Sequence, residues 1–335
     1  MLQINPRVSP QEVQSFLGGE LYYNSKIPEQ QQYAFKELIL KHYLPKLEQV
    51  LHKNEPDILK DTLIDALFAK LGAFKLSHYQ SDEIEAGHKQ NYFGNVAGSV
   101  DFVLKKDDNV ACILEAKKPN SAEMISAKNA NTTALHECIL YYLREKERAK
   151  ELNKRFEVKY IIITDFYEFF FFKEREFDRF FYENDYIKSL YDRHKALCKD
   201  SDLTKEKDEQ IRNKDLYAAL KQHLSSQNFS AQLSPLLLNL ENLKDDKCDI
   251  KPFFKAFAPE FLLDKYIHKS EINEAFYKEL LYILGLKVIE SGDQRNKIIP
   301  NDVSGTLYEN IAQSLQDESQ KNPRKHYLTY HCLAK

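Results

Sequence analysis

The sequence is poor in glycine and has no closely paired cysteines. Only nine of its 335 residues are glycine. A Rossmann-type domain or a glycine-rich phosphate loop needs several glycines where the backbone approaches the phosphates, so both are disfavoured. The five cysteines are scattered, without a Cys-x-x-Cys pair. That spacing suggests neither a zinc site nor a disulfide framework, and it fits a reducing cytoplasm.

Long apolar runs and a strong excess of one charge are also missing. No stretch of about 18 apolar residues occurs, so we expect no membrane span, and the first residues lack the pattern of a secretory signal. The net charge of −3 does not predict a nucleic-acid-binding protein, although phosphate contacts require only a local basic patch. Candidate patches are Lys117-Lys118, Lys128 and Arg144–Arg148, of which the last mixes both signs like a solvated helix face.

Two short strands joined by a polar turn are predicted between residues 98 and 117. Apolar and other side chains alternate from residue 100 to residue 105, and the second strand, from Val110 to Ala116, is almost wholly apolar. Asp107-Asp108-Asn109 between them has the residue types of a turn. A hairpin folded about Asp108 gives the pairs Asp101–Glu115, Val103–Ile113 and Lys105–Ala111.

This register brings three charged side chains to one face of the hairpin. Asp101 and Glu115 are directly opposed, and Glu115 shares its face with Lys117 because strand side chains alternate. Two carboxylates so close repel unless a cation lies between them. Mg²⁺ prefers such hard oxygen ligands, with Mn²⁺ as a substitute. The predicted metal ligands are therefore Asp101, Glu115 and the carbonyl of Ala116, and the predicted catalytic residues are Asp101, Glu115 and Lys117.

The order Asp101…Glu115-Ala116-Lys117 is similar to the pattern of the PD-(D/E)XK nucleases. The Glu-x-Lys tripeptide is common on protein surfaces, but here it ends an apolar strand and a strand-embedded aspartate precedes it across a hairpin. A cross-strand ion pair on a solvated sheet face is the alternative. Lys118, Ser99 and Asn120 flank the three residues and are the expected DNA contacts.

Helices on both sides of the hairpin offer possible supporting residues. A helix that begins near Glu55 carries Asp61, and nucleases of this type often bring one acid from such a helix to the metal. A polar outer face is the alternative for Asp61. A second helix is predicted over residues 121–151, with Ser121 as its N-cap. On it, His136, Glu137 and Tyr141 lie within two turns and can face the cleft, whereas ordinary packing is the alternative for the histidine.

The predicted fold class is α/β (α+β), with a mixed sheet flanked by helices and followed by an all-α region. Val158–Thr164 is the strongest strand, and the four phenylalanines of 169–172 indicate a returning strand buried on both faces. Residues 76–97 are expected to be a loop, and a helix over 29–51 is expected to kink at Pro45. The predicted divisions are a nuclease domain with a helical N-terminal segment (1–185), a charged linker (186–215) and a helical connector (216–335).

Several further segments resemble one family in the same order along the chain. The stretches 98–125, 134–145, 160–172, 276–286 and 305–310 resemble the amino-terminal nuclease region and helical connector of type IIG restriction–modification enzymes. The resemblance covers most of the chain from about residue 50 onward. It implies a restriction-endonuclease-like PD-(D/E)XK fold and a Mg²⁺-dependent type II site-specific deoxyribonuclease that cleaves double-stranded DNA.

Enzymes of this family continue into an adenine methyltransferase, which this sequence lacks. It has neither a glycine-rich cofactor loop nor an Asn-Pro-Pro-Tyr motif, because its Asn-Pro pairs are Asn5-Pro6 and Asn322-Pro323. We therefore expect no methyltransferase activity and no S-adenosylmethionine binding, and an adenine methyltransferase domain or subunit is an expected partner. A truncated reading frame or one half of a split system would both explain the missing part.

Two other functions remain open at the level of sequence. The first is a catalytically inactive nuclease-like module that binds DNA or docks a methyltransferase. The second is a different nuclease role, such as a repair exonuclease or the motor-associated nuclease of type I systems, although the helicase motifs of the latter are absent. Metal binding separates the first alternative from an endonuclease, and a requirement for DNA ends separates the second.

Overall fold

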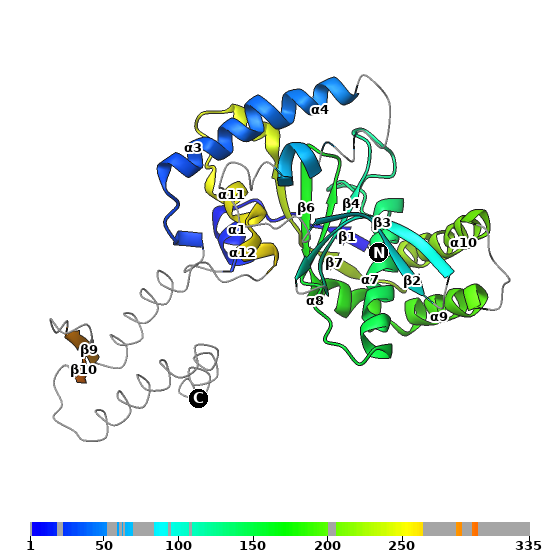
Figure 1. Ribbon diagram of the computed structural model, residues 1–335. Coiled ribbons are helices and arrows are strands. Elements are labelled where there is room, and N and C mark those ends of the chain that lie inside the picture. Colours follow the sequence, from blue (N-terminus) through cyan, green and yellow to red (C-terminus); the bar gives the residue numbers. More distant parts are fainter. Residues whose placement is uncertain are drawn as a thin grey trace. The chain divides into compact units, whose positions relative to one another are not determined.

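The structure is a computed structural model, and its residues fall into two compact units, 1–265 and 266–335. The described residues are 2–18, 23–51, 59, 62, 64–69, 84–92, 95–106, 109–199, 206–263, 286–289 and 297–300. In the second unit, β9 (Leu286–Ile289) and β10 (Lys297–Pro300) form an antiparallel pair. All further elements belong to the first unit (Figure 1).

A six-stranded mixed sheet forms the centre of the first unit, with the order β2-β3-β4-β5-β6-β8. β4 and β5 pair in parallel, and the other neighbours pair antiparallel. The parallel pair requires a crossover, which the long helix after β4 supplies. The strands are β2 (Ile84–Tyr92), β3 (Asn95–Lys106), β4 (Asn109–Ala116), β5 (Tyr160–Thr164), β6 (Glu168–Lys173) and β8 (Leu236–Asn239).

Helices cover both faces of this sheet, and the two layers enclose separate apolar clusters. One cluster includes Phe169 and Phe171 of β6, and the other includes Phe170 and Phe172. The prediction that this strand is buried on both faces is therefore confirmed.

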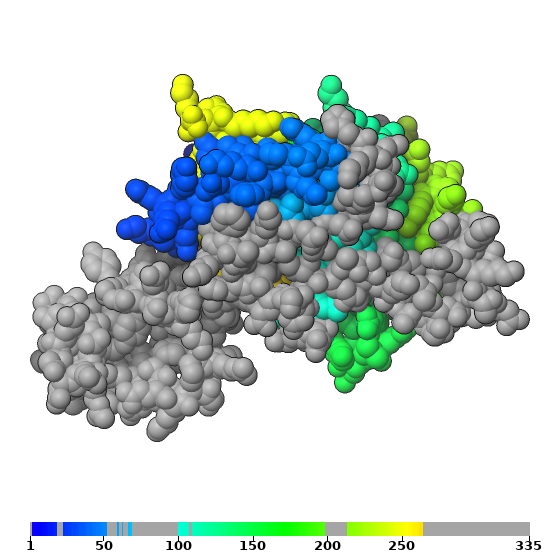
Figure 2. Space-filling model, turned by 45° about the horizontal axis from the view of Figure 1, so that its top comes forward, coloured from blue at the N-terminus to red at the C-terminus, as the bar shows by residue number. Residues whose placement is uncertain are grey.

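Chain segments from both ends of the unit cover the first face. The helices of this layer are α1 (Pro10–Phe16), α3 (Glu29–Glu37), η1 (Leu38–Tyr43), α4 (Leu44–Leu51), η2 (Ile64–Ala69), η5 (Leu240–Lys244), α11 (Lys251–Phe257) and α12 (Pro259–Leu262). Figure 2 shows blue α3 and α4 beside the yellow residues that follow β8, and Lys36 pairs with Asp246 across this boundary at 2.8 Å.

The middle of the chain covers the opposite face. Its helices are α7 (Thr133–Glu151), α8 (Glu174–Phe177), η4 (Asp178–Tyr182), α9 (Asp185–Lys199) and α10 (Glu206–Ser225). A short parallel pair, β1 (Leu2–Ile4) and β7 (Ala231–Leu233), packs against the same cluster. In the described part of the chain, no helix combines the length and the apolar character needed to cross a bilayer.

The predicted hairpin register is confirmed in its middle and is wrong at its turn. Val103 pairs with Ile113 as expected, but a register shift follows Leu104, and Lys105 pairs with Val110 instead of Ala111. A bulge adds one residue to one strand, and alternation in the sequence does not reveal it.

Three other predictions of secondary structure need correction. Residues 84–92, expected to be a loop, form edge strand β2; an edge strand need not show the apolar pattern of a central one. The helix predicted from residue 121 begins only at Thr133, although it ends at Glu151 as expected. Asn120 has a φ of 62°, and polar turns fill residues 121–132, because asparagine and serine favour turns over helix interiors.

The region after residue 216 is not all-α. β7, β8, β9 and β10 all lie in it, and β8 completes the central sheet by pairing with β6. The sheet thus extends beyond the predicted 1–185 nuclease domain, and the predicted linker 186–215 contains helical residues of α9 and α10. The division of the chain into three functional domains stays a prediction.

The helix expected over residues 29–51 is present but changes its hydrogen bonding before Pro45. The π-helical segment η1 lies between α3 and α4. Proline has no N–H to donate to the preceding turn and its ring crowds the carbonyl there. A wider π-helical turn just before it accommodates that defect without ending the helix.

Candidate functional site

Asp101 connects β3 and β4 at the end of the hairpin opposite its turn. Its side chain lies in β3 and is buried, with 8% of the residue exposed. Its Oδ2 accepts a hydrogen bond from the backbone N–H of Ala116 at 3.0 Å. The carboxylate is therefore held at the end of β4, where the sequence predicted it.

Glu115 is the most deeply buried charged residue of the cluster, with 3% of the residue exposed. Its Oε2 is buried and has no hydrogen-bond partner among the described residues. Burial, followed by the nearby carboxylates of Asp101 and Glu137, raises the pKa of Glu115 well above its usual value, against the opposing effect of Lys117. A buried carboxylate with an unsatisfied oxygen is costly unless a cation approaches it.

Lys117 supplies the positive charge that the cluster contains. Its ammonium lies 2.9 Å from Glu115 Oε1 and 2.5 Å from Glu137 Oε2. Its backbone N–H donates to the carbonyl of Thr164 in β5 at 2.8 Å, so the residue continues the parallel pairing of β4. Burial acts to lower the pKa of Lys117, but the two glutamates outweigh it, and the net pKa is raised. The lysine is therefore a fixed cation.

Helix α7 brings two of the predicted supporting residues to this cluster. Glu137 forms the ion pair with Lys117. Tyr141, one turn later, is buried, and burial first and the charge of Glu115 second raise its pKa. The same helix adds Cys138, and α10 adds Tyr217, whose pKa also responds to Glu137 after burial. The sequence gives no local signal for Tyr217, because it comes from a helix about 100 residues after β4.

The other two predicted supporting residues, His136 and Asp61, are not among the residues that the structure brings together around Glu115. The ring of His136 stacks on Tyr217 of α10 at 6.2 Å, and its Nε2–H donates to Oδ1 of Asn131, which precedes α7, at 2.7 Å. Burial, with a smaller effect of Lys221, lowers the pKa of His136 to about 4. It is therefore a neutral packing residue, which was the alternative to a functional role. Asp61 lies outside the described residues.

Comparison with known proteins gives one family match. The model of the family described as "Domain of unknown function (DUF7149)" matches residues 84–270, which is more than half of the chain. The chain belongs to the DUF7149 family. No curated protein and no solved structure gives a significant match. The DUF7149 match contains the hairpin, α7 and every residue of the cluster described above.

The three predicted DNA contacts of this DUF7149 chain differ in their surroundings. Lys118 and Asn120 are exposed and lie in the turn that leaves β4. Ser99 lies in β3, where its backbone pairs with Lys89 of β2, and its side chain is outside the described residues. Lys118 and Asn120 therefore lie on the surface at this end of the sheet.

The donor set of the DUF7149 cluster suits a divalent cation in its chemistry. Asp101 and Glu115 provide hard carboxylate oxygens, and the unsatisfied Oε2 of Glu115 is one that a cation would satisfy. Within the described residues, no group of three His, Cys, Asp or Glu side chains is arranged as a complete metal cage. The residues fit an open site with two carboxylates and the Ala116 carbonyl, which leaves further positions for water and substrate oxygens.

Proposed function

We propose that the chain is a Mg²⁺-dependent endonuclease that hydrolyses phosphodiester bonds of double-stranded DNA, with a fold of the PD-(D/E)XK type. The observation that carries the proposal is the buried Glu115 carboxylate, with one unsatisfied oxygen, beside Asp101 and Lys117. Such a cluster destabilises a fold unless a cation or a substrate group joins it. This loss of stability is therefore better explained by function than by packing.

Each residue has a distinct role in the proposed reaction. Asp101 and Glu115 would hold Mg²⁺ with the Ala116 carbonyl, and the bound ion would lower the pKa of water and offset charge on the phosphate. Lys117, charged at neutral pH, stabilises the negative charge that develops on the phosphate oxygens. Glu137 holds the Lys117 ammonium in place. Tyr141 helps to close the site from bulk water because it is buried against these charges.

The resemblance to type IIG enzymes supports a place for this activity in a restriction–modification system. In that system the chain supplies the restriction part, and an adenine methyltransferase domain or subunit supplies modification. A cytoplasmic location, where the DNA substrate and Mg²⁺ are found, is part of the same proposal.

The test compares two glutamates that each have one buried side-chain oxygen without a hydrogen-bond partner among the described residues. Glu115→Gln is expected to abolish Mg²⁺-dependent cutting of plasmid DNA, and Lys117→Ala likewise, with the fold checked by circular dichroism. Glu176→Gln is the matched control, because Glu176 Oε2 is also buried without a partner but Glu176 bonds to the backbone N–H of Ser234. Full cutting by Glu115→Gln would rule out this site.

One observation favours the inactive DNA-binding or methyltransferase-docking alternative. The Lys117 ammonium already lies between Glu115 and Glu137, so an internal cation partly neutralises the cluster. Isothermal titration with Mn²⁺ separates the two functions. An endonuclease should bind Mn²⁺ in a manner that Asp101→Ala removes, whereas a docking module should give no such heat while it still binds DNA.

A further inference from the structure

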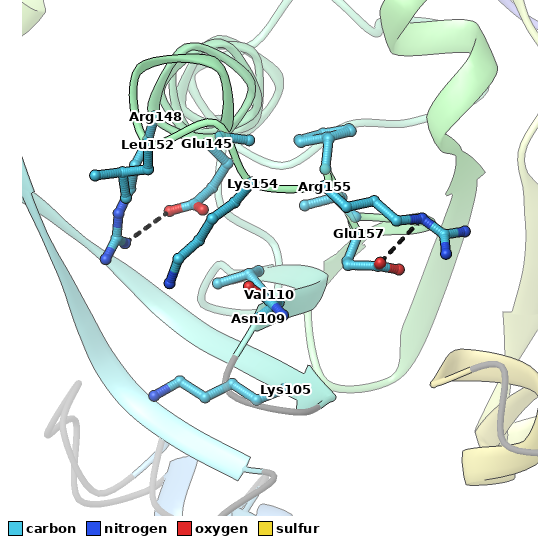
Figure 3. Close-up of a pocket in the computed structure, with 12 residues that line it drawn as sticks. Lys105, Asn109, Val110, Glu145, Arg148, Leu152, Lys154, Arg155 and Glu157 are labelled. Atoms are coloured by element: carbon cyan, nitrogen blue, oxygen red, sulfur yellow. Dashed lines mark ion pairs between the residues drawn. The ribbon is translucent and has the colours of Figure 1, made fainter.

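A second cluster of charges lines a cavity at the opposite end of β4. The cavity has a volume of about 120 Å³ and lies between the β3–β4 hairpin, the last turns of α7 and the segment that leads into β5 (Figure 3). Its charged lining residues are Lys105, Arg148, Lys154, Arg155, Glu145 and Glu157. The described lining thus carries four cationic side chains and two carboxylates.

The two carboxylates pair with the two arginines, and the lining contains two more cationic side chains than carboxylates. Arg155 Nε lies 3.1 Å from Glu157 Oε1, and Arg148 Nη1 lies 3.7 Å from Glu145 Oε1. Figure 3 shows these pairs on opposite sides of the cavity, with Lys154 beside the Glu145 pair. Two guanidinium groups held in this way are preorganised for an anion, because arginine presents several N–H donors in a rigid plane.

The end of α7 does not repel an anion as strongly as a bare helix terminus would. The C-terminal end of a helix carries partial negative charge on its free carbonyl groups. Here the N–H groups of Leu152, Asn153 and Lys154 donate to carbonyls of the last turn. Arg148 lies in that turn as well. Three of the terminal carbonyls are therefore satisfied, and Arg148 lines the cavity.

Size and exposure restrict the ligand that fits. The volume is well below the roughly 300–1,000 Å³ of sites for drug-sized ligands, so the cavity suits one small group. Arg155 has 78% of its side chain exposed, and Arg148 has 41%. A ligand can thus place one anionic group in the cavity while the rest of it remains outside.

We propose that this cavity binds a phosphate group. The four cationic side chains, two of them arginines paired with carboxylates, recognise the tetrahedral oxyanion, and the small open volume accepts a phosphate that is attached to a larger molecule or free. The site is distinct from the cluster at Glu115, because about 20 Å of strand separates Asn109 from Glu115 at roughly 3.3 Å per residue. The source is either the backbone of a nucleic acid or a small phosphorylated ligand.

The first experiment measures binding of a labelled DNA duplex by the full chain in EDTA, where no divalent metal contributes. Lys105→Ala/Lys154→Ala should weaken binding roughly tenfold and reduce the slope of log affinity against log salt by about one, because the contact with the one phosphate in the cavity is lost. The matched control is Lys46→Ala/Lys247→Ala, which removes the same charge from two exposed lysines that do not line the cavity. That control should leave both values unchanged.

A second variant should raise the affinity for the duplex, an effect that damage to the fold would not produce. Asp107 and Asp108 are the two residues between Lys106 and Asn109, which pair in this hairpin. Asp107→Asn/Asp108→Asn should strengthen duplex binding about threefold, because it removes two negative charges from the sequence between Lys106 and Asn109, and Asn109 lines the cavity. Asparagine suits the turn as well as aspartate does.

A parallel calorimetric titration uses inorganic phosphate and a nucleoside monophosphate. Loss of duplex affinity in the lysine variant, with the control unchanged, assigns the cavity to nucleic acid. Loss of phosphate heat with unchanged duplex affinity assigns it to a small phosphorylated ligand. If the lysine variant loses neither duplex affinity nor phosphate heat, the proposal is overturned. None of these results depends on Mn²⁺ binding at Asp101, so failure of this proposal and failure of the proposed cleavage site are distinguishable.

Discussion

The two ends of β4 carry charge clusters that differ in sign and in burial. At the C-terminal end the cluster has three carboxylates and one ammonium, which pairs with Glu115 and Glu137, and Glu115 is almost fully buried. At the N-terminal end, four cations meet two carboxylates around an open cavity, and Arg155 is largely exposed.

The difference shows how burial changes what an ion pair does. In water-exposed positions the gain and the cost of pairing nearly cancel, so such a pair mainly orients its members. In the interior, an unbalanced charge lowers the stability of the fold, and a cation that binds the buried carboxylates relieves that loss. The buried end is therefore suited to chemistry, and the open end to binding. Four predictions test this contrast, in order of the size of the expected effect.

Removing a carboxylate at the buried end should change the rate constant of cleavage. Asp101→Asn keeps an oxygen that accepts from the Ala116 N–H, so the fold should persist, but the charge is lost. We expect single-turnover cutting with Mg²⁺ to fall by roughly 100-fold or more. Lys154→Gln at the open end should instead act on DNA affinity. Equal losses of rate constant in both variants would contradict the contrast.

Replacing the cation of each pair by methionine should affect stability unequally. Lys117→Met leaves the carboxylates of Glu115 and Glu137 unbalanced in the interior, and we expect a loss of roughly 2–3 kcal/mol in the free energy of unfolding. Arg155→Met should cost less than about 0.5 kcal/mol. Urea denaturation at pH 7 measures both, and comparable losses would show that burial is not the deciding factor.

His136 tests the effect of burial on a group outside both clusters. Its folded pKa of about 4 lies below the ordinary 6.5, so the unfolded chain binds more protons between these values and stability falls as the pH is lowered through that window. From this residue we expect a loss of about 2 kcal/mol between pH 7 and pH 5. His136→Asn should remove this part of the dependence. An unchanged pH profile in the variant would show that the imidazole is not buried as described.

Thr132 gives the smallest expected change in stability, and this change is a gain instead of a loss. It precedes α7 as the N-cap, yet its side chain makes no capping hydrogen bond, and Oγ1 is buried without a partner among the described residues. Thr132→Val keeps the shape and removes the unsatisfied hydroxyl, so we expect a gain of about 0.5 kcal/mol. Thermal unfolding measures it, with Thr133→Val as the neighbouring control. A clear loss of stability at residue 132 would mean that the hydroxyl does cap the helix.

Local rules of the sequence were sufficient for the centre of the candidate site. Alternation with period two placed Asp101, Glu115 and Lys117 on one face, and the apolar run of β6 indicated burial on both faces. The sequence also suggested Glu137, through its position on the following helix. These features depend on residues close to one another along the chain, where spacing determines geometry.

Features that depend on distant pairing were not predictable in the same way. β2 carries the polar composition of an edge strand, and β8 joins the sheet from a region predicted to be a helical connector. His136 and Glu137 are adjacent in sequence, yet only the structure shows that the first packs toward α10 and the second reaches Lys117. The bulge near Lys105 likewise follows from the sheet as a whole.

The pairing of the first strand with one of the last has a consequence for biosynthesis. β1 pairs with β7, and β8 forms one edge of the central sheet by pairing with β6. Contacts between such distant segments form slowly because a long loop must first close. On the ribosome, the amino-terminal strand must therefore wait for most of the first unit to emerge, and the edge of β6 stays uncovered meanwhile. A chain released early would expose that edge to aggregation.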